Sequence, residues 1–175
     1  MKNKLLLLLM CVASVTVYAQ ENYQYFKSAG FKVKCGCSLY VNNTFIQMAK
    51  QQGTIDIIGA YICAENKEDY NSGVIININI YDESKSYTTT STAGYSKVEK
   101  AFLDSYAANL AASNLNYQYI SYKGVNALQY SFSQNGLPTK AIVFVKNKKS
   151  YLIQLATRKN LQTKYSSLIQ SFEFY

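Results

Sequence analysis

The most informative absence in this 175-residue chain is histidine, of which it has none. Histidine is the usual general base, the usual proton shuttle near neutral pH and the commonest metal ligand, so these three roles lose their ordinary residue. The chain also has no Gly-x-Ser-x-Gly motif, no Ser-x-x-Lys in a convincing context and no glycine loop that would cradle a phosphate. The sequence therefore predicts a protein that is not an enzyme, with no catalytic residue, no cofactor and no metal.

Carboxylates are also few, with ten acidic residues against eighteen basic ones. Two acid pairs, Glu68-Asp69 and Asp82-Glu83, are the only ones placed to hydrolyse a glycosidic bond or to hold Ca²⁺. Both pairs lie beside predicted loops in a segment crowded with acids. A solvated loop is therefore the interpretation that we prefer.

No apolar run reaches the length of about 20 residues that a membrane span needs. Residues 1–19 instead have the pattern of a cleaved signal peptide, with two lysines, a short leucine-rich run and Val17-Tyr18-Ala19 at the end. A lipoprotein anchored through Cys11 is the alternative, but Met10 is too large for that cleavage site. We expect a periplasmic or secreted protein whose residues 20–175 form a single domain without a transmembrane segment.

The positive charge is concentrated near the C-terminus. The formal charge of +8 falls to about +6 without residues 1–19, and the excess comes from residues 137–175. The basic residues there are Lys140, Lys146, Lys148, Lys149, Arg158, Lys159 and Lys164, against Glu173 alone. They could contact an anionic surface weakly, or they could simply keep turns and helix faces soluble, which we favour. One arginine among lysines, in an exported chain, argues against binding to nucleic acid.

Three cysteines remain after residue 19, namely Cys35, Cys37 and Cys63. Residues two apart on an extended strand are too far apart to bridge each other. In an oxidising compartment we therefore expect Cys63 to pair with Cys35 or Cys37, and the residues alone do not decide which. A soft-metal or redox site on Cys-Gly-Cys is the weaker alternative, because it lacks histidine partners and the Cys-x-x-Cys spacing.

Hydrophobic periodicity predicts strands and helices in a mixed order. In the first half, the expected elements are strands at 31–35 and 38–41, a helix at 43–52, and strands at 57–63 and 74–81. A helix follows, with Ser96 and Glu99 as a capping box and an apolar stripe of Val98, Phe102, Tyr106 and Leu110. Residues 85–94 before it are expected to form a loop or an edge.

The second half predicts four strands, at 117–122, 125–132, 139–146 and 151–157, joined by short turns. A helix closes the chain, with Asn160 as its cap and Leu161, Tyr165, Leu168, Ile169 and Phe172 on its apolar side. Because amphipathic helices need a sheet to cover, we expect an α+β fold in which an antiparallel sheet of about six strands is flanked by helices.

The last 50 or so residues resemble the end of PsbP-like domains. The matching positions are Gly124, Tyr151-Leu152-Ile153, Ala156 and Ser171-Phe172. The resemblance implies an α/β/α sandwich around an antiparallel sheet, and accessory domains that bind or help to assemble other proteins, generally without catalysis. It brings no catalytic residue to this chain.

Tyrosine is abundant, with 17 in the chain. A row of tyrosines on a sheet is typical of a protein-binding or glycan-binding surface, but strand propensity alone also explains such a row, and we favour that explanation. The candidate binding surface consists of Tyr117, Tyr119, Tyr130, Tyr151, Lys146, Lys148 and Lys149. Alternation places Tyr117 and Tyr119 on one face of the sheet and Tyr122 on the other.

These observations lead to three hypotheses about function. The first is an exported, non-catalytic accessory domain that contacts another envelope or secreted protein. The second is a periplasmic immunity protein that neutralises a toxin or hydrolase. The third is a carrier of a small ligand, which predicts an apolar cavity between a helix and the sheet.

Overall fold

The computed structural model describes residues 22–53, 56–65, 73–88 and 91–175. In chain order its elements are β1 (Gln24–Phe26), η1 (Lys27–Ala29), β2 (Phe31–Val33), β3 (Tyr40–Val41), α1 (Asn43–Gln52), β4 (Ile57–Glu65), β5 (Val74–Asp82), η2 (Ser84–Ser86), α2 (Thr92–Ala112), β6 (Tyr117–Tyr122), β7 (Val125–Gln134), β8 (Leu137–Lys146), β9 (Lys149–Thr157), α3 (Leu161–Ser171) and β10 (Glu173–Phe174). The expected leader (residues 1–19) and the acid pair Glu68-Asp69 lie outside the described residues. Within the described ranges, no helix combines the length and the apolar character that crossing a bilayer requires.

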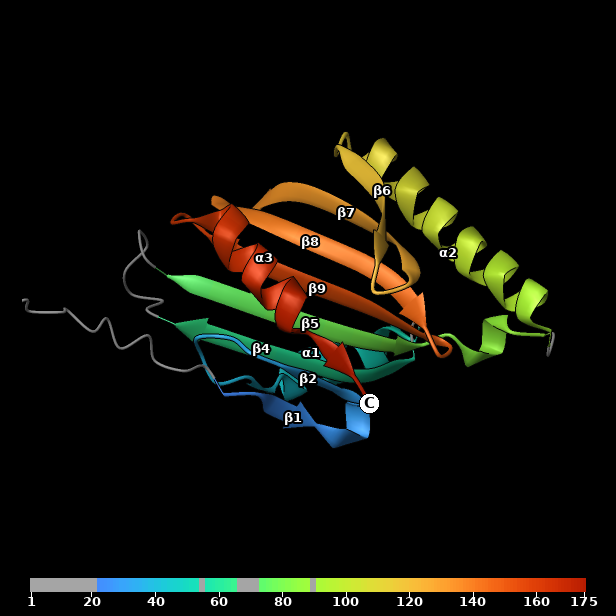
Figure 1. Cartoon of the computed structure of the whole chain (residues 1–175), viewed down its shortest axis with the longest axis horizontal. Coiled ribbons are helices and arrows are strands. Elements are labelled where there is room, and N and C mark those ends of the chain that lie inside the picture. The colour runs from blue at the N-terminus through green and yellow to red at the C-terminus, as the bar shows by residue number, and fades with distance from the viewer. Residues whose placement is uncertain (1–21, 54–55, 66–72, 89–90) are drawn as a thin grey trace, which may run out of the picture.

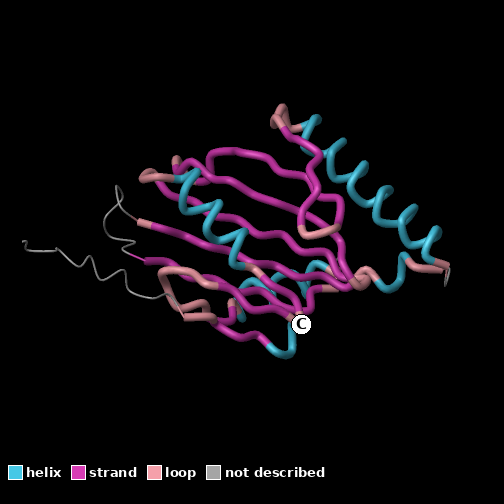
Figure 2. Tube along the Cα trace, viewed as in Figure 1, coloured by secondary structure: helices cyan, strands magenta, loops and turns pink. Residues whose placement is uncertain are grey.

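A seven-stranded antiparallel sheet in the order β3-β4-β5-β9-β8-β7-β6 forms the centre of the molecule (Figure 1). Helix α3 covers one face, and α2 packs on the other face over β6, β7 and β8. The α+β class with helices on both sides of an antiparallel sheet is therefore confirmed. The sheet has seven strands where about six were expected, and a second sheet of three short strands, β1-β2-β10, was not anticipated. Figure 2 shows how strands dominate the body between the helices.

Type I′ turns build the meander from β6 to β9. Such turns need two consecutive residues with positive φ, and they match the twist of the strands that they join. The three pairs are Lys123-Gly124, Asn135-Gly136 and Asn147-Lys148, all with φ between 48° and 81°. The turn chemistry in the sequence thus located these hairpins correctly. Strand β9 then pairs along its whole length with β5, from Lys149 opposite Asp82 to Thr157 opposite Val74, and joins the two halves of the chain.

The face under α3 holds the larger core. Ile76, Ile78 and Ile80 of β5 point into it, as strict alternation predicted, and each is at most 3% exposed. Tyr165 and Leu168 of α3 belong to the same core cluster. Helix α3 begins after Asn160 as expected, but Asn160 has a left-handed backbone and its side chain makes no capping hydrogen bond.

Helix α2 starts earlier than predicted. Ser91 has the extended backbone of an N-cap, and its hydroxyl accepts a hydrogen bond from the amide of Gly94 at 3.1 Å. Ser96 and Glu99 therefore lie inside the helix, and the capping box expected there is wrong. The buried stripe consists of Leu103, Ala107 and Leu110. Of the expected stripe, only Leu110 is fully buried, while Val98, Phe102 and Tyr106 lie at its border.

The three-stranded sheet has two chemically different faces, because successive side chains on a strand point to opposite sides. Phe26, Phe31 and Phe174 stand opposite one another in register and face the core. Tyr25, Lys32 and Glu173 form the next row and face outward. Between β1 and β2 the chain reverses at Gly30, whose φ of 76° is unfavourable for a residue with a side chain.

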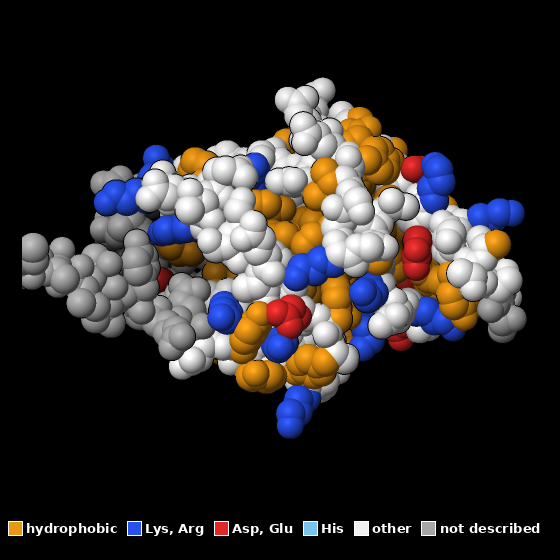
Figure 3. Space-filling model, viewed as in Figure 1, with side chains coloured by type: hydrophobic (Ala, Val, Ile, Leu, Met, Phe, Trp, Pro, Cys, Tyr) orange, Lys and Arg blue, Asp and Glu red, His pale blue; other side chains and the backbone are white. Residues whose placement is uncertain are grey.

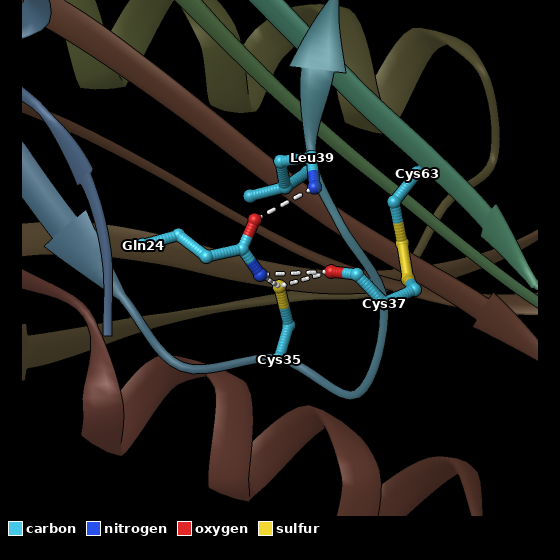
Figure 4. Close-up of a disulfide and its surroundings, with 5 residues drawn as sticks. All are labelled: Gln24, Cys35, Cys37, Leu39 and Cys63. Carbon is cyan, nitrogen blue, oxygen red and sulfur yellow. Dashed lines mark hydrogen bonds between the residues drawn. A yellow bond between two sulfur atoms is a disulfide. The ribbon is translucent and has the colours of Figure 1, made fainter. Parts of the chain in front are cut away.

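A disulfide ties this small sheet to the large one. Cys37 pairs with Cys63 of β4, which resolves the choice that the sequence left open (Figure 4). Gln24 of β1 fixes the loop: its amide donates to the carbonyl oxygen of Cys37 at 2.9 Å and to Sγ of Cys35 at 3.2 Å, and its oxygen accepts from the amide of Leu39 at 2.8 Å.

Replacement of Cys37 by alanine is expected to lower the free energy of unfolding by about 3 kcal/mol, because the bridge closes a loop between residues 26 apart. Chemical denaturation of the oxidised protein measures this loss. Cys35→Ser is the matched control, since a serine hydroxyl can donate to the carbonyl oxygen of Cys37 as the thiol does. Peptide mapping that finds Cys35 bonded to Cys63 in the unmodified protein would contradict the assignment.

Two buried tyrosines of the core differ in the hydrogen bonding of their hydroxyl groups. Tyr122 donates to the carbonyl oxygen of Ile169 at 2.8 Å. Within the described ranges, the buried hydroxyl of Tyr165 has no hydrogen-bond partner. Burial raises the pKa of both phenols, because the charged form is disfavoured away from water.

Tyr165→Phe is therefore expected to leave stability unchanged or to raise it by about 1 kcal/mol, because it removes an unpaired buried hydroxyl. Tyr122→Phe should lower stability by a similar amount, since it leaves the carbonyl oxygen of Ile169 without that donor. Urea denaturation of the two variants side by side gives the comparison. Equal destabilisation by both would show that the hydroxyl of Tyr165 is satisfied.

Candidate functional site

The outer face of the three-stranded sheet gathers aromatic and charged side chains. We call it the small-sheet patch and define it as Tyr23, Tyr25, Lys32, Lys34, Glu173 and Tyr175. Tyr25 is 61% exposed and Tyr175 is 57% exposed, among the highest values for large hydrophobic residues in the described chain. Figure 3 shows hydrophobic and lysine side chains intermixed around an acidic one over β1 and β2.

The rings of the small-sheet patch form a row. The centroids of Tyr23 and Tyr25 are 6.3 Å apart, and those of Tyr25 and Tyr175 are 6.5 Å apart. The Nζ atom of Lys32 lies 4.4 Å from the Tyr23 ring centre, and that of Lys34 lies 4.7 Å from it. Cations at this distance are attracted to the face of the ring. The patch is thus held in place before any partner binds.

Glu173 organises the polar part of the patch. Its carboxylate accepts a hydrogen bond from the hydroxyl of Tyr23 and forms an ion pair with Lys32 at 2.9 Å. The hydrogen bond from Tyr23, with that from Lys32, holds the pKa of Glu173 below its ordinary value of 4.5. The same contact raises the pKa of the Tyr23 phenol, because the proton is shared with a carboxylate.

The residues predicted from the sequence as a binding surface do not lie together. Tyr117 and Tyr119 are on the α2 side of the sheet, opposite Tyr130 and Leu128 of β7, and Tyr151 points to the α3 side. Tyr130 is 6% exposed and Tyr151 is 3% exposed, so neither is available to a partner. Only Tyr119, at 53%, presents its ring to solvent. The prediction that Tyr117 and Tyr119 share a face opposite to Tyr122 is confirmed.

The predicted lysines are likewise dispersed. Lys146 lies over the ring of Phe174 at 4.5 Å, on the α3 side. Lys148 lies over Tyr87 and Tyr95 at the start of α2, at 5.7 and 5.2 Å. Lys149 stands opposite Asp82 on β5. These three lysines therefore do not form one basic surface with the predicted tyrosines.

A second candidate site is a groove beside α2, on the face of the large sheet away from α3. A cavity of about 530 Å³ there is lined by Phe102 and Tyr106 of α2 and by Tyr81, Val143 and Leu152 of the sheet. A neighbouring cavity of about 410 Å³ shares Phe102 and Tyr106, so the two are continuous along the helix. We call this region the α2 groove.

The mouth of the α2 groove is acidic. Asp56, Asp82 and Glu83 line it together with Lys85, which forms an ion pair with Asp56. Hydrogen bonds from Ser84, helped by the charges of Lys85 and Lys149, hold the pKa of Asp82 below its ordinary value. Burial raises the pKa of the Tyr81 and Tyr106 phenols.

Neither site is evident from the sequence, for identifiable reasons. The small-sheet patch depends on β1 and β10, which are three and two residues long and too short to show alternation. Phe102 and Tyr106 were read as core residues. The pair Asp82-Glu83 was noticed, but it was interpreted as part of a solvated loop.

Comparisons with known proteins add little to this geometry. No family model matches the chain, and no curated protein matches it. Among solved structures, it is similar to the solution structure of cyanobacterial PsbP (CyanoP) from Synechocystis sp. PCC 6803, at 13% identity, over 88% of this chain and 92% of that one, with a TM-score of 0.49. Membership of the PsbP-like family stays a prediction.

Tyr23→Phe is expected to raise the pKa of Glu173 toward 4.5. The substitution removes the hydrogen bond from the Tyr23 hydroxyl, which is the largest contribution that favours the charged carboxylate. Since the folded-state pKa is lowered, the contribution of Glu173 to stability is present above its unfolded pKa and is lost as pH falls through the folded value. A ¹³C NMR titration of the side-chain carboxyl measures the change.

Tyr119→Phe is the matched control, because the hydroxyl of Tyr119 donates to Asp104 on the opposite side of the sheet. It should raise the pKa of Asp104 and leave that of Glu173 unchanged. An unchanged titration of Glu173 in Tyr23→Phe would contradict the arrangement described for the patch.

Proposed function

We propose that this chain is an exported, non-catalytic binding protein that attaches to another protein of the cell envelope through the small-sheet patch. The observation that carries the proposal is the row of rings from half-buried Tyr23 to the exposed Tyr25 and Tyr175, in which Lys32, ion-paired to Glu173, lies over the ring of Tyr23. Tyrosine supplies rigid contact area at a low cost in conformational entropy, and it is enriched among the residues that dominate binding energy.

The chemistry of the patch favours a partner with an acidic surface. Lys32 and Lys34 are balanced only by Glu173, and Lys123 acts on Glu173 from the neighbouring hairpin. Edge strand β1 adds a further feature, because in the described chain only β2 pairs with it. Its open edge can accept a strand from the partner.

Export is supported by two features. Residues 1–19 have the sequence pattern of a signal peptide, and Cys37 and Cys63 form a disulfide. Disulfides persist in oxidising compartments such as the periplasm, and they are rare in the cytosol. We therefore place the binding event in the periplasm or outside the cell.

The test uses the unmodified chain as bait in a periplasmic extract, followed by quantitative mass spectrometry of the captured proteins. We expect one protein to be recovered in stoichiometric amount. The double variant Tyr25→Ser/Tyr175→Ser should weaken binding of that purified protein by roughly 30-fold or more, as expected for hot-spot residues.

The control is Tyr119→Ser, because Tyr119 is exposed to a similar extent but lies on the α2 side. It should bind like the unmodified protein. Equal binding by the double variant, or recovery of no stoichiometric partner, would contradict the proposal.

A second candidate function, carriage of a small ligand, is favoured by the α2 groove. Pockets for small molecules usually have volumes of about 300–1,000 Å³ and combine apolar walls with a few polar groups. The main cavity, at about 530 Å³, falls in this range and has both features. Binding of the neutral dye Nile red, lost when Leu152 is replaced by a charged residue, tests this function without regard to ligand class.

A further inference from the structure

We infer that the α2 groove binds an organic cation with an apolar body, such as an aromatic amine. This inference rests on the second candidate function and specifies its ligand. Three observations carry it: the apolar floor of the groove, the excess of carboxylates at its mouth, and the lack of an ion-pair partner for Glu83 among the described residues.

The floor suits a flat or elongated apolar group. Leu152 and Val143 lie on adjacent strands and face the same side as Tyr81, while Phe102 and Tyr106 form the wall on α2. The hydroxyl of Tyr106 is hydrogen-bonded to that of Tyr130 at 2.8 Å, which fixes the position of the wall ring. Aromatic faces favour both apolar rings and cations.

The mouth selects positive charge. Asp56, Asp82 and Glu83 stand there against Lys85, and Lys149 influences Asp82 from β9. Lys85 already forms an ion pair with Asp56. Asp82 and Glu83 are therefore the two carboxylates of the mouth that form no ion pair within the described ranges.

Glu83 is the carboxylate best placed to receive such a cation. It lines both the main cavity and its neighbour along α2. One of its oxygens accepts a hydrogen bond from the hydroxyl of Ser150 at 2.7 Å, which orients the group. In the part of the chain that the structure describes, no lysine or arginine lies within ion-pair distance of it. A bound ammonium group supplies the missing countercharge.

The chain's own composition provides a clean measurement. It has no tryptophan, so the protein contributes no indole fluorescence to that of the probe. Tryptamine and indole-3-propanoate share the indole ring and the ethylene arm, but they carry opposite charges at neutral pH. Fluorescence anisotropy of each probe, titrated with the full oxidised protein, gives the two affinities under identical conditions.

We expect tryptamine to bind at least tenfold more tightly than indole-3-propanoate at low salt. Glu83→Gln should weaken tryptamine binding by roughly fivefold, as for the loss of one charge near the ligand, and should leave thermal stability nearly unchanged. Glu65→Gln, which removes an exposed carboxylate opposite Val74, at the other end of β5 from Asp82, is the matched control and should leave tryptamine binding unchanged.

Equal binding of the two probes, tighter binding of the acid, or an unaltered affinity in Glu83→Gln would overturn the inference. If Nile red still binds in these cases, the carrier function stands and only the ligand class is wrong. If neither Nile red nor tryptamine binds, both the carrier function and the inference fail.

Discussion

The contact on which this architecture depends is the packing of Phe31 against rings from three other parts of the chain. Phe31 is completely buried; it stacks on Phe26 at 4.8 Å and on Phe172 at 4.9 Å, and it meets Tyr61 edge-on at 5.4 Å. Offset and edge-to-face pairs of this kind contribute roughly 0.5–1.5 kcal/mol each beyond their buried area. Through this residue the small sheet, the end of α3 and β4 become one core.

The small-sheet patch follows from that contact. Successive side chains on a strand point to opposite faces. Because Phe26, Phe31 and Phe174 face the core, the residues next to them in the sequence face outward. Tyr25 and Tyr175 are therefore exposed because the phenylalanines are buried. The disulfide from Cys37 to Cys63 holds the same two sheets together at another point. The patch is thus as rigid as the core beneath it.

Large parts of the fold could be predicted from the sequence because their signals are local. Helix α1 has the expected bounds, and each of the three hairpin turns of the meander falls at a pair that contains Asn or Gly, the residues that favour positive φ. The face of each tyrosine on β6 also followed from alternation. Alternation does not predict whether a tyrosine is buried, because burial depends on what covers the face of the sheet. Tyr130 lies under α2, and Tyr151 lies within the aromatic cluster at the end of α3.

The candidate sites escaped prediction for a related reason. Helical periodicity shows that Phe102 and Tyr106 lie on one side of α2, but it does not show whether the sheet extends fully beneath them. Helix α2 covers β6, β7 and β8. Over β9 and β5 the floor residues Leu152 and Tyr81 stay only half-buried, and this incomplete cover creates the groove. The pairing of Cys37 with Cys63 likewise depends on a loop that Gln24 shapes from a distant position.

The two surfaces are placed to act independently. The small-sheet patch is basic and the mouth of the α2 groove is acidic, and the large sheet separates them. Charges more than a Debye length apart, about 8 Å at physiological ionic strength, are largely screened from each other where they face solvent.

Strand β8 is the physical link between the two surfaces, since Val143 lines the groove while Phe144 and Lys146 contact Phe174 behind the patch. Coupling requires two discrete arrangements with different contacts. A strand that is hydrogen-bonded on both sides, to β7 and β9, offers only one. We therefore expect a partner on the patch and a ligand in the groove to bind without altering each other's affinity.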